Sequence, residues 1–375
     1  MAIHDVPGIE TTDERLSDAA LVAAVAGVVR RPRVEIADSF VLHAPLELAA
    51  RSALLPLVRP SARIAARARI AAIAGEYAAF GVAVPPPRSV TFESTAEGAI
   101  ALGDAIAAGE LDTVDAVAAE LGRTAAGADL PALLTDALLP RLSAAAHAPI
   151  FLYQMARVAP GGELTAELVR PLARELARFP DWSLGWLDRG PAVSAVLPPE
   201  ALFDAVAAAP PLGVLGSTFI YPVMHQVDES GVAAELLSEP VRGVDVHAGG
   251  RLLLRAAALS MLQEPPEHAP YGWSHCLTMP QAALGIAGHA RDPNVALAVA
   301  ATYVVGFRAA LATRPLARAY APADPGVQLA DALDAGPQVA AAAVWHAPEA
   351  VMGGIVTELA TRASRHGDAH LVKYT

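Results

Sequence analysis

The side chains most capable of chemistry in this chain are one lysine and a set of histidines. Lys373 is the only lysine among 375 residues, although lysine and arginine together number 27. A buried lysine can lose its proton and then act as a nucleophile or be modified, which an arginine cannot do. His370 lies three residues earlier, so on a helix its imidazole shares a face with the Lys373 amine. The pattern indicates a reactive lysine. The alternative is a surface lysine near a frayed terminus.

Six of the 11 histidines lie among apolar neighbours and are candidates for a buried site. Buried imidazoles need hydrogen-bond partners or a metal ion. Several histidines with an oxygen donor form a ligand set that suits iron, zinc, copper or nickel. For each one taken singly, a hydrogen-bonded core histidine is the alternative. The six are His43, His147, His225, His275, His346 and His370.

The tripeptide His-Ala-Pro recurs, beginning at His43, His147, His268 and His346. Proline is tolerated in the first turn of a helix, but further in it removes a backbone hydrogen bond. The recurrence therefore predicts that these histidines stand at helix entrances. In a chain rich in alanine and proline, some of the matches are expected by chance.

The elements that must position these residues are predicted to be helices. The chain is 54% hydrophobic but only 5% aromatic, and it is rich in alanine. Alanine is the best helix former, and few stretches show the alternation of β-branched residues that marks strands. We therefore predict an all-α fold, a large multi-helix single domain with a metal site in its helical core. The relevant helices are expected near 40–55, 150–158, 273–289 and 349–366.

Domain organisation is expected to be simple. Residues 1–37 are predicted to form an N-terminal helix and linker, opened by the capping-box pattern Thr11-Thr-Asp-Glu14. Residues 38–375 are predicted to form one helical catalytic domain, because helical patterns resume on the far side of each proline-rich break.

Composition and motifs exclude several functional classes. The net charge is −12 and no basic stripe is present, so nucleic acid is not an expected partner. The single cysteine, Cys276, excludes an intrachain disulfide and any Cys-x-x-Cys site. No signal peptide or long apolar span is visible, which favours a cytoplasmic protein away from the membrane. The sequence also lacks Gly-x-Gly-x-x-Gly, Walker, His-Glu-x-x-His and Glu-x-x-His motifs.

Four short histidine segments follow one another in a distinctive order. They are His43-Ala-Pro-Leu-Glu-Leu, Ala146-His147-Ala-Pro-Ile-Phe-Leu-Tyr, Ser274-His275-Cys-Leu-Thr278 and Asp368-Ala-His370-Leu-Val-Lys373. With these segments in view, the sequence resembles the questin oxidase-like family from about Asp38 to Tyr374. The last segment carries most of the specificity, because it is similar to the family's Asp-Glu-His-Val-Ile-Lys.

The resemblance implies an oxygenase of aromatic polyketides. One branch of the family consists of ring-cleaving dioxygenases that hold a mononuclear non-heme iron with four histidines and a carboxylated lysine. Carried over by motif, the resemblance implies Fe(II), or another divalent transition metal, bound by His43, His147, His275, His370 and a CO2-derived carbamate on Lys373. The carbamate is an anionic oxygen donor, and its formation requires a lowered lysine pKa, which burial favours.

The substrate implied by the resemblance is an aromatic polyketide, quinone-like or hydroquinone metabolite, which would react with O2. His225, on an apolar stretch, is a candidate acid or base near the metal, against the alternative of a satisfied core histidine. Scattered aromatic residues are candidates to line the pocket, although ordinary core packing is the simpler interpretation. They are Trp186, Phe219, Tyr221, Trp273 and Trp345.

The sequence departs from the family pattern and leaves alternatives open. Ala369 replaces the family's glutamate before the last histidine, and Leu152 stands where a histidine or arginine is usual. These departures bear on the substrate and on the support around the metal more than on the ligands. One alternative is an NADPH-requiring Baeyer–Villiger-type monooxygenase of the same family. The other is a non-catalytic helical protein that binds a small molecule. The oligomeric state is left open.

Overall fold

Helices with apolar faces build nearly all of this computed structural model. The described residues are 16–34, 39–127, 129–158, 163–180, 183–188, 196–212, 220–268 and 272–374. Within these ranges the only β structure is two isolated bridges, Arg33 with Ala83 and Arg141 with Ser183. The predicted all-α fold is confirmed.

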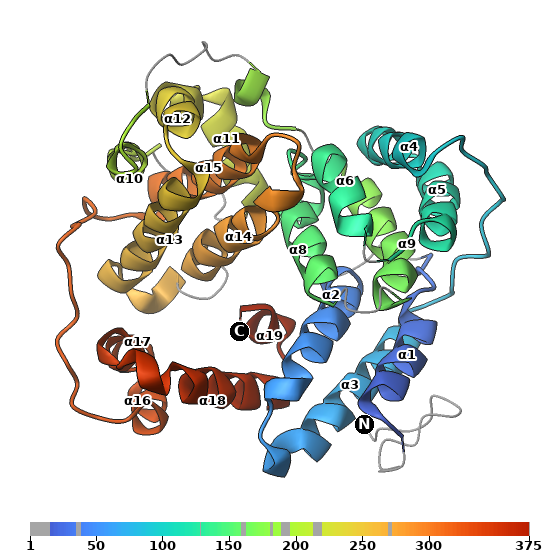
Figure 1. Cartoon of the computed structure of the whole chain (residues 1–375), viewed down its shortest axis with the longest axis horizontal. Coiled ribbons are helices and arrows are strands. Elements are labelled where there is room, and N and C mark those ends of the chain that lie inside the picture. Colours follow the sequence, from blue (N-terminus) through green and yellow to red (C-terminus); the bar gives the residue numbers. More distant parts are fainter. Residues whose placement is uncertain are drawn as a thin grey trace.

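The N-terminal half forms the blue to green part of Figure 1. Its α-helices are α1 (Asp18–Val29), α2 (Ser39–Leu54), α3 (Arg63–Ala78), α4 (Thr95–Ala108), α5 (Leu111–Thr124), α6 (Leu130–Leu138), α7 (Ser143–Ala146), α8 (Ala148–Val158) and α9 (Glu163–Arg178). Helix α1 packs against α3 and α9 and contributes Leu21 and Val25 to the main core. The predicted boundary between residues 37 and 38 falls outside the described residues.

The C-terminal half forms the yellow to red part of Figure 1. Its α-helices are α10 (Glu200–Ala207), α11 (Ile220–Glu229), α12 (Val232–Gly243), α13 (Val246–Gln263), α14 (Ser274–Gly285), α15 (Pro293–Leu311), α16 (Leu329–Ala335), α17 (Pro337–His346), α18 (Met352–Arg365) and α19 (Ala369–Tyr374). Helix α13 has 18 residues and includes His247 in its first turn.

Helix starts follow local side-chain chemistry. The Ser17 hydroxyl accepts a hydrogen bond from the Ala20 amide and so caps α1. The predicted capping box at Thr11–Glu14 lies outside the described residues. Asp245 caps α13 in the same way through the Ala248 amide.

Helix α15 is the centre of the second half. It contacts α10, α11, α12, α13 and α14. It is the one single helix in the described chain that is long and apolar enough to cross a membrane, but 83% of that window is buried inside the protein. Apolar residues on every side are what a helix surrounded by other helices requires. Its composition is therefore that of a core helix.

The C-terminal tail returns to the N-terminal half. Helix α19 packs against α2 and α18, beside the C-terminal end marked in Figure 1. A small apolar cluster joins these three helices through Ala50, Leu54, Ala360, Ala363 and Val372. Because burial of apolar surface stabilises such contacts, the tail is docked into the fold and not frayed.

Candidate metal centre

Four segments that are distant in the sequence bring the predicted residues together. His43 lies in the first part of α2, His147 directly precedes α8, and His275 lies in the first turn of α14. His370 and Lys373 lie on α19. The exposed fractions are 5% for His43 and His147, 4% for His275 and 7% for Lys373. The site therefore depends on tertiary packing of α2, α8, α14 and α19.

The four imidazoles form a chain of direct contacts. The Nε2 atoms of His43 and His147 are 3.1 Å apart. The ring centroids of His43 and His370 are 4.5 Å apart, and those of His275 and His370 are 5.6 Å apart. Two nitrogens about 2.1 Å from one metal at a right angle would lie about 3.0 Å apart. The Nε2 separation of His43 and His147 thus matches two neighbouring ligands.

Hydrogen bonds fix which nitrogen two of the rings present. The Ala144 carbonyl lies 2.7 Å from Nδ1 of His147, and Asp368 Oδ1 lies 2.9 Å from Nδ1 of His370. Each oxygen is an acceptor, so each Nδ1 carries the proton and donates it. The lone pair of each ring is then on Nε2. This arrangement, with the second nitrogen held by an oxygen, is what orients a metal-ligating histidine.

The backbone before His147 is unusual. Ala144 and Ala146 have φ angles of 49° and 64°, values that L-residues rarely adopt. The Ala146 carbonyl accepts a hydrogen bond from the buried Tyr303 hydroxyl, and the Ala144 carbonyl accepts the one from His147. Such strain costs on the order of 1–3 kcal/mol and tends to occur at functional sites. Here it turns the chain so that His147 enters the core.

Lys373 is the most unusual member of the group. Its amine is fully enclosed, and Nζ has no hydrogen-bond partner among the described residues. Burial lowers the pKa of Lys373 to about 7, while the charges of Asp368 and Glu47 oppose that shift. Much of the amine is therefore neutral near pH 7. A neutral buried amine is the form that adds CO2.

The neighbouring histidines are also held in their neutral form. Burial, and then the charge of Lys373, hold the pKa of His147 well below its usual range. Burial and Lys373 also lower the pKa of His370, although Asp368 acts in the opposite direction. Neutral imidazole is the state that binds a metal.

The types of side chain in this cluster suit a metal ion, but their positions in this structure do not form a coordination shell. Among the described residues, no group of three or more histidine, cysteine, aspartate or glutamate side chains is spaced to hold a metal. His43 and His147 instead contact each other directly. Two features nevertheless fit a bound cation with an added anionic ligand: the oriented Nε2 atoms, and a buried lysine amine with no hydrogen-bond partner among the residues that the structure describes.

Other predicted residues lie elsewhere. His225 is on α11, 32% exposed, and pairs through Nδ1 with Glu229 at 3.0 Å. His346 is exposed at the end of α17, and its Nε2 donates to the Pro322 carbonyl at 2.8 Å. The expectation of a buried environment was wrong for His346.

The aromatic residues predicted to line the pocket differ in their burial. Trp186 and Trp273 are buried, and Trp345 is 40% exposed. Phe219 and the side chain of Tyr221 lie outside the described part of the chain. The indole of Trp186 donates to the Thr302 hydroxyl at 3.1 Å, which indicates ordinary core packing.

Sequence reasoning missed the polar residues that support the histidines. Asp368 holds His370, and Glu47 and Arg51 lie on the same face of α2 as His43. A signal for the second pair was present, because positions 43, 47 and 51 are four residues apart and share one helical face.

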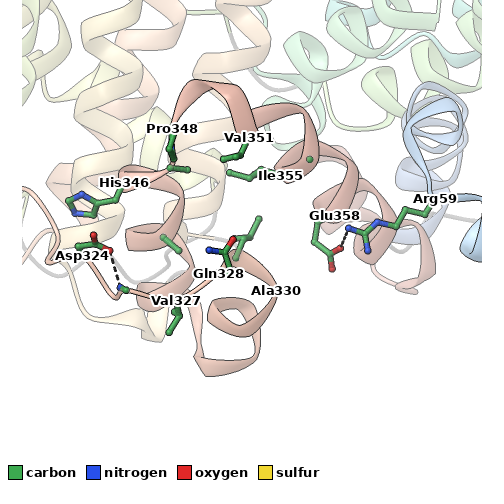
Figure 2. Close-up of a pocket in the computed structure, with 15 residues that line it drawn as sticks. Arg59, Asp324, Val327, Gln328, Ala330, His346, Pro348, Val351, Ile355 and Glu358 are labelled. Carbon is green, nitrogen blue, oxygen red and sulfur yellow. Dashed lines mark hydrogen bonds and ion pairs between the residues drawn. The ribbon is translucent and has the colours of Figure 1, made fainter.

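A separate groove lies at the other end of the C-terminal half, between α16, α17 and α18. Figure 2 shows its lining, with a volume of about 650 Å³. Val327, Val351 and Ile355 form an apolar part, and His346 and Asp324 lie at one end. None of the five predicted ligands lines this groove. The groove is therefore a feature distinct from the histidine cluster.

Comparison with protein-family models, with curated proteins and with solved structures finds no match to this chain. The resemblance to the questin oxidase-like family stays a hypothesis that depends on the four motifs.

Proposed function

We propose that this protein is a metal-dependent oxygenase with a mononuclear non-heme iron. The ligands would be His43, His147, His275, His370 and a carbamate on Lys373. The substrate would be an aromatic, quinone-like or hydroquinone metabolite that reacts with O2 in the cytoplasm. The bound iron would supply the activation of O2.

One observation carries the proposal. The only lysine of the chain is buried, its charge acts on His147 and His370, and its amine has no hydrogen-bond partner among the described residues. A buried amine without a partner is costly, so a native protein is expected to use it or to modify it. Addition of CO2 to the neutral amine forms a carbamate and releases one proton. The product is an anion beside four neutral imidazoles, which is a balanced ligand set for a divalent cation.

The surrounding residues would hold this ligand set and its environment. Asp368 and the Ala144 carbonyl keep Nδ1 of His370 and His147 protonated, so both Nε2 atoms stay available. The burial of the group excludes water, which strengthens the electrostatic attraction of the site for a cation.

Metal content tests the proposal directly. The purified full-length protein would be loaded with Fe(II) under anaerobic conditions and bicarbonate, desalted, and analysed by mass spectrometry for metals. About one equivalent of iron is expected, because burial and several ligands give high affinity. Retention below roughly a tenth of an equivalent of any transition metal would contradict the proposal.

The carbamate has its own signature. In protein loaded with diamagnetic Zn(II), 13C-labelled bicarbonate is expected to give one carbonyl NMR signal in the wild type that is lost in Lys373→Met. If the protein binds metal but gives no such signal, the histidine ligands remain supported and the carbamate on Lys373 is contradicted.

A further inference from the structure

The corner between α18 and α19 is held by side chains from α2 and α3. Helix α18 ends at Arg365, and its C-cap His366 is extended, so the chain turns sharply before α19. The last carbonyls of a helix lack partners within the helix and must find them elsewhere. At this corner they find arginines.

Arg51 is the central residue of the corner. Its guanidinium donates from Nη1 to the Ser364 carbonyl at 2.8 Å and from Nη2 to the His366 carbonyl at 2.6 Å. Its Nε donates to Glu47 at 2.7 Å. The side chains of Arg51 and Glu47 are only 2% and 1% exposed. Such a buried ion pair, with its remaining donors directed at two carbonyls, fixes one geometry of the turn.

Arg69 extends the contact from α3. Its Nε lies 3.3 Å from Glu47, and its Nη2 donates to the Gly367 carbonyl at 3.4 Å. Its Nη1 pairs with Glu76 at 2.7 Å. Two arginines therefore bind three backbone carbonyls of the corner, those of Ser364, His366 and Gly367, and two carboxylates balance their charge.

The geometry assigns Arg51, supported by Glu47 and Arg69, as the positioning clamp that docks α19 and so delivers His370 and Lys373 to the histidine cluster. We call these three residues the corner clamp. The inference rests on the proposed function for its metal readout, but its docking claim is independent of metal.

The arrangement on α2 gives the clamp a direct link to the site. His43, Glu47 and Arg51 are spaced by four residues along one helix face. One end of this face presents an imidazole to His147 and His370, and the other end holds the backbone that leads into His370. Helix α2 therefore sets the distance between His43 and the ligands on α19. Loss of the clamp should release His370 and Lys373, while His43 stays in place.

The main test uses Arg51→Met in the full-length protein, with Arg51→Lys as the conservative variant. Hydrogen exchange of the metal-free protein is expected to accelerate at least about tenfold in residues 369–374 of Arg51→Met, with α15 unchanged. The apparent Kd for Co(II) should rise by about 10- to 100-fold, as for other residues that orient metal ligands. Arg51→Lys should fall between, because an ammonium cannot bridge both carbonyls and Glu47.

The matched control is Arg308→Met. Arg308 is also buried, 3% exposed, and donates to the Ser260 hydroxyl and the Arg314 carbonyl, far along the chain from the corner. A general loss of stability would act equally in both variants. The clamp requires that exchange in residues 369–374 accelerates only in the Arg51 variants.

A second variant guards against failure to fold. Glu47→Gln with Arg51→Met removes both charges, so no unpaired carboxylate is left buried. Wild-type exchange in residues 369–374 of both this variant and Arg51→Met would overturn the clamp. If the wild type binds neither Co(II) nor Fe(II), the proposed function fails while the exchange measurement still decides the clamp.

Discussion

Two regions of this molecule carry the same tripeptide and use it differently. His43 and His147 begin His-Ala-Pro segments and are buried, with their Nε2 atoms 3.1 Å apart. His346 begins another, but it is exposed at one end of the groove in Figure 2, where a backbone carbonyl binds its Nε2. The sequence motif is therefore not what creates the histidine cluster.

The difference between the two regions lies in what each histidine meets. In the cluster, four helices converge, and a buried lysine whose charge acts on His147 and His370 has no hydrogen-bond partner for its amine in the described chain. In the groove, polar groups are paired, as Arg59 is with Glu358 at 2.9 Å. A buried amine without a partner among the described residues requires an explanation, which the proposed carbamate supplies, whereas a satisfied exposed histidine requires none.

The largest expected effect comes from Lys373→Arg. Arginine keeps the positive charge but cannot form a carbamate, so metal retention should fall from about one equivalent to roughly a tenth or less. Metal analysis after anaerobic Fe(II) loading measures this, and circular dichroism checks that the helical fold persists. Lys373→Met, which places no charge in the core, should lose metal equally. Wild-type metal content in either variant would reject the carbamate.

The second effect contrasts the two histidine regions directly. His43→Ala should weaken Co(II) binding by at least about 100-fold, because it removes one of the proposed metal ligands. His346→Ala should leave Co(II) binding unchanged. Isothermal titration with Co(II) measures both. A loss in His346→Ala together with unchanged binding in His43→Ala would mean that the groove, and not the cluster, binds the metal.

The sequence predicted the all-α fold because alanine content and helical periodicity are local signals. It also predicted that Lys373 would lie in the core, although the compositional anomaly alone favoured a surface lysine, because the resemblance set Lys373 beside the four histidine segments. It failed at His346, whose apolar neighbours in the chain did not become neighbours in space. It also missed the corner clamp, since a contact between Arg51 and residues 364–366 depends on tertiary packing.

The prediction that the His-Ala-Pro prolines mark helix entrances holds for one of the two buried segments and fails for the other. Pro149 lies at the second position of α8, as a helix entrance requires. Pro45 lies further inside α2, where it cannot donate a backbone hydrogen bond. The tertiary contacts of α2 override the local preference at that position.

An intermediate effect concerns pH. The Lys373 pKa is about 7 in the folded protein, against about 10.4 in an unfolded chain. Between these values the unfolded state binds more protons, so rising pH should stabilise the metal-free wild type relative to Lys373→Met. The relative gain is about 1.4 kcal/mol per pH unit, measurable by urea denaturation from pH 7 to 9. At fixed dissolved CO2, metal uptake should also rise as pH increases through 7. A relative stability that does not change with pH would show that Lys373 titrates normally.

The smallest effect is expected at Asp368, which has two tasks in α19. Its Oδ1 accepts the His370 amide at 2.8 Å and the ring Nδ1 at 2.9 Å. Burial acts to raise the pKa of Asp368, but these hydrogen bonds outweigh it and the pKa is lowered. Asp368→Asn keeps an oxygen acceptor but removes the charge, so Co(II) affinity should fall only about tenfold. Asp368→Ala removes the acceptor as well and should also destabilise the docked helix by about 1 kcal/mol. Equal Co(II) affinities in the two variants would mean that Asp368 supports metal binding through its charge and not by orienting His370. Asp368 would then act electrostatically, whereas the corner clamp acts by position.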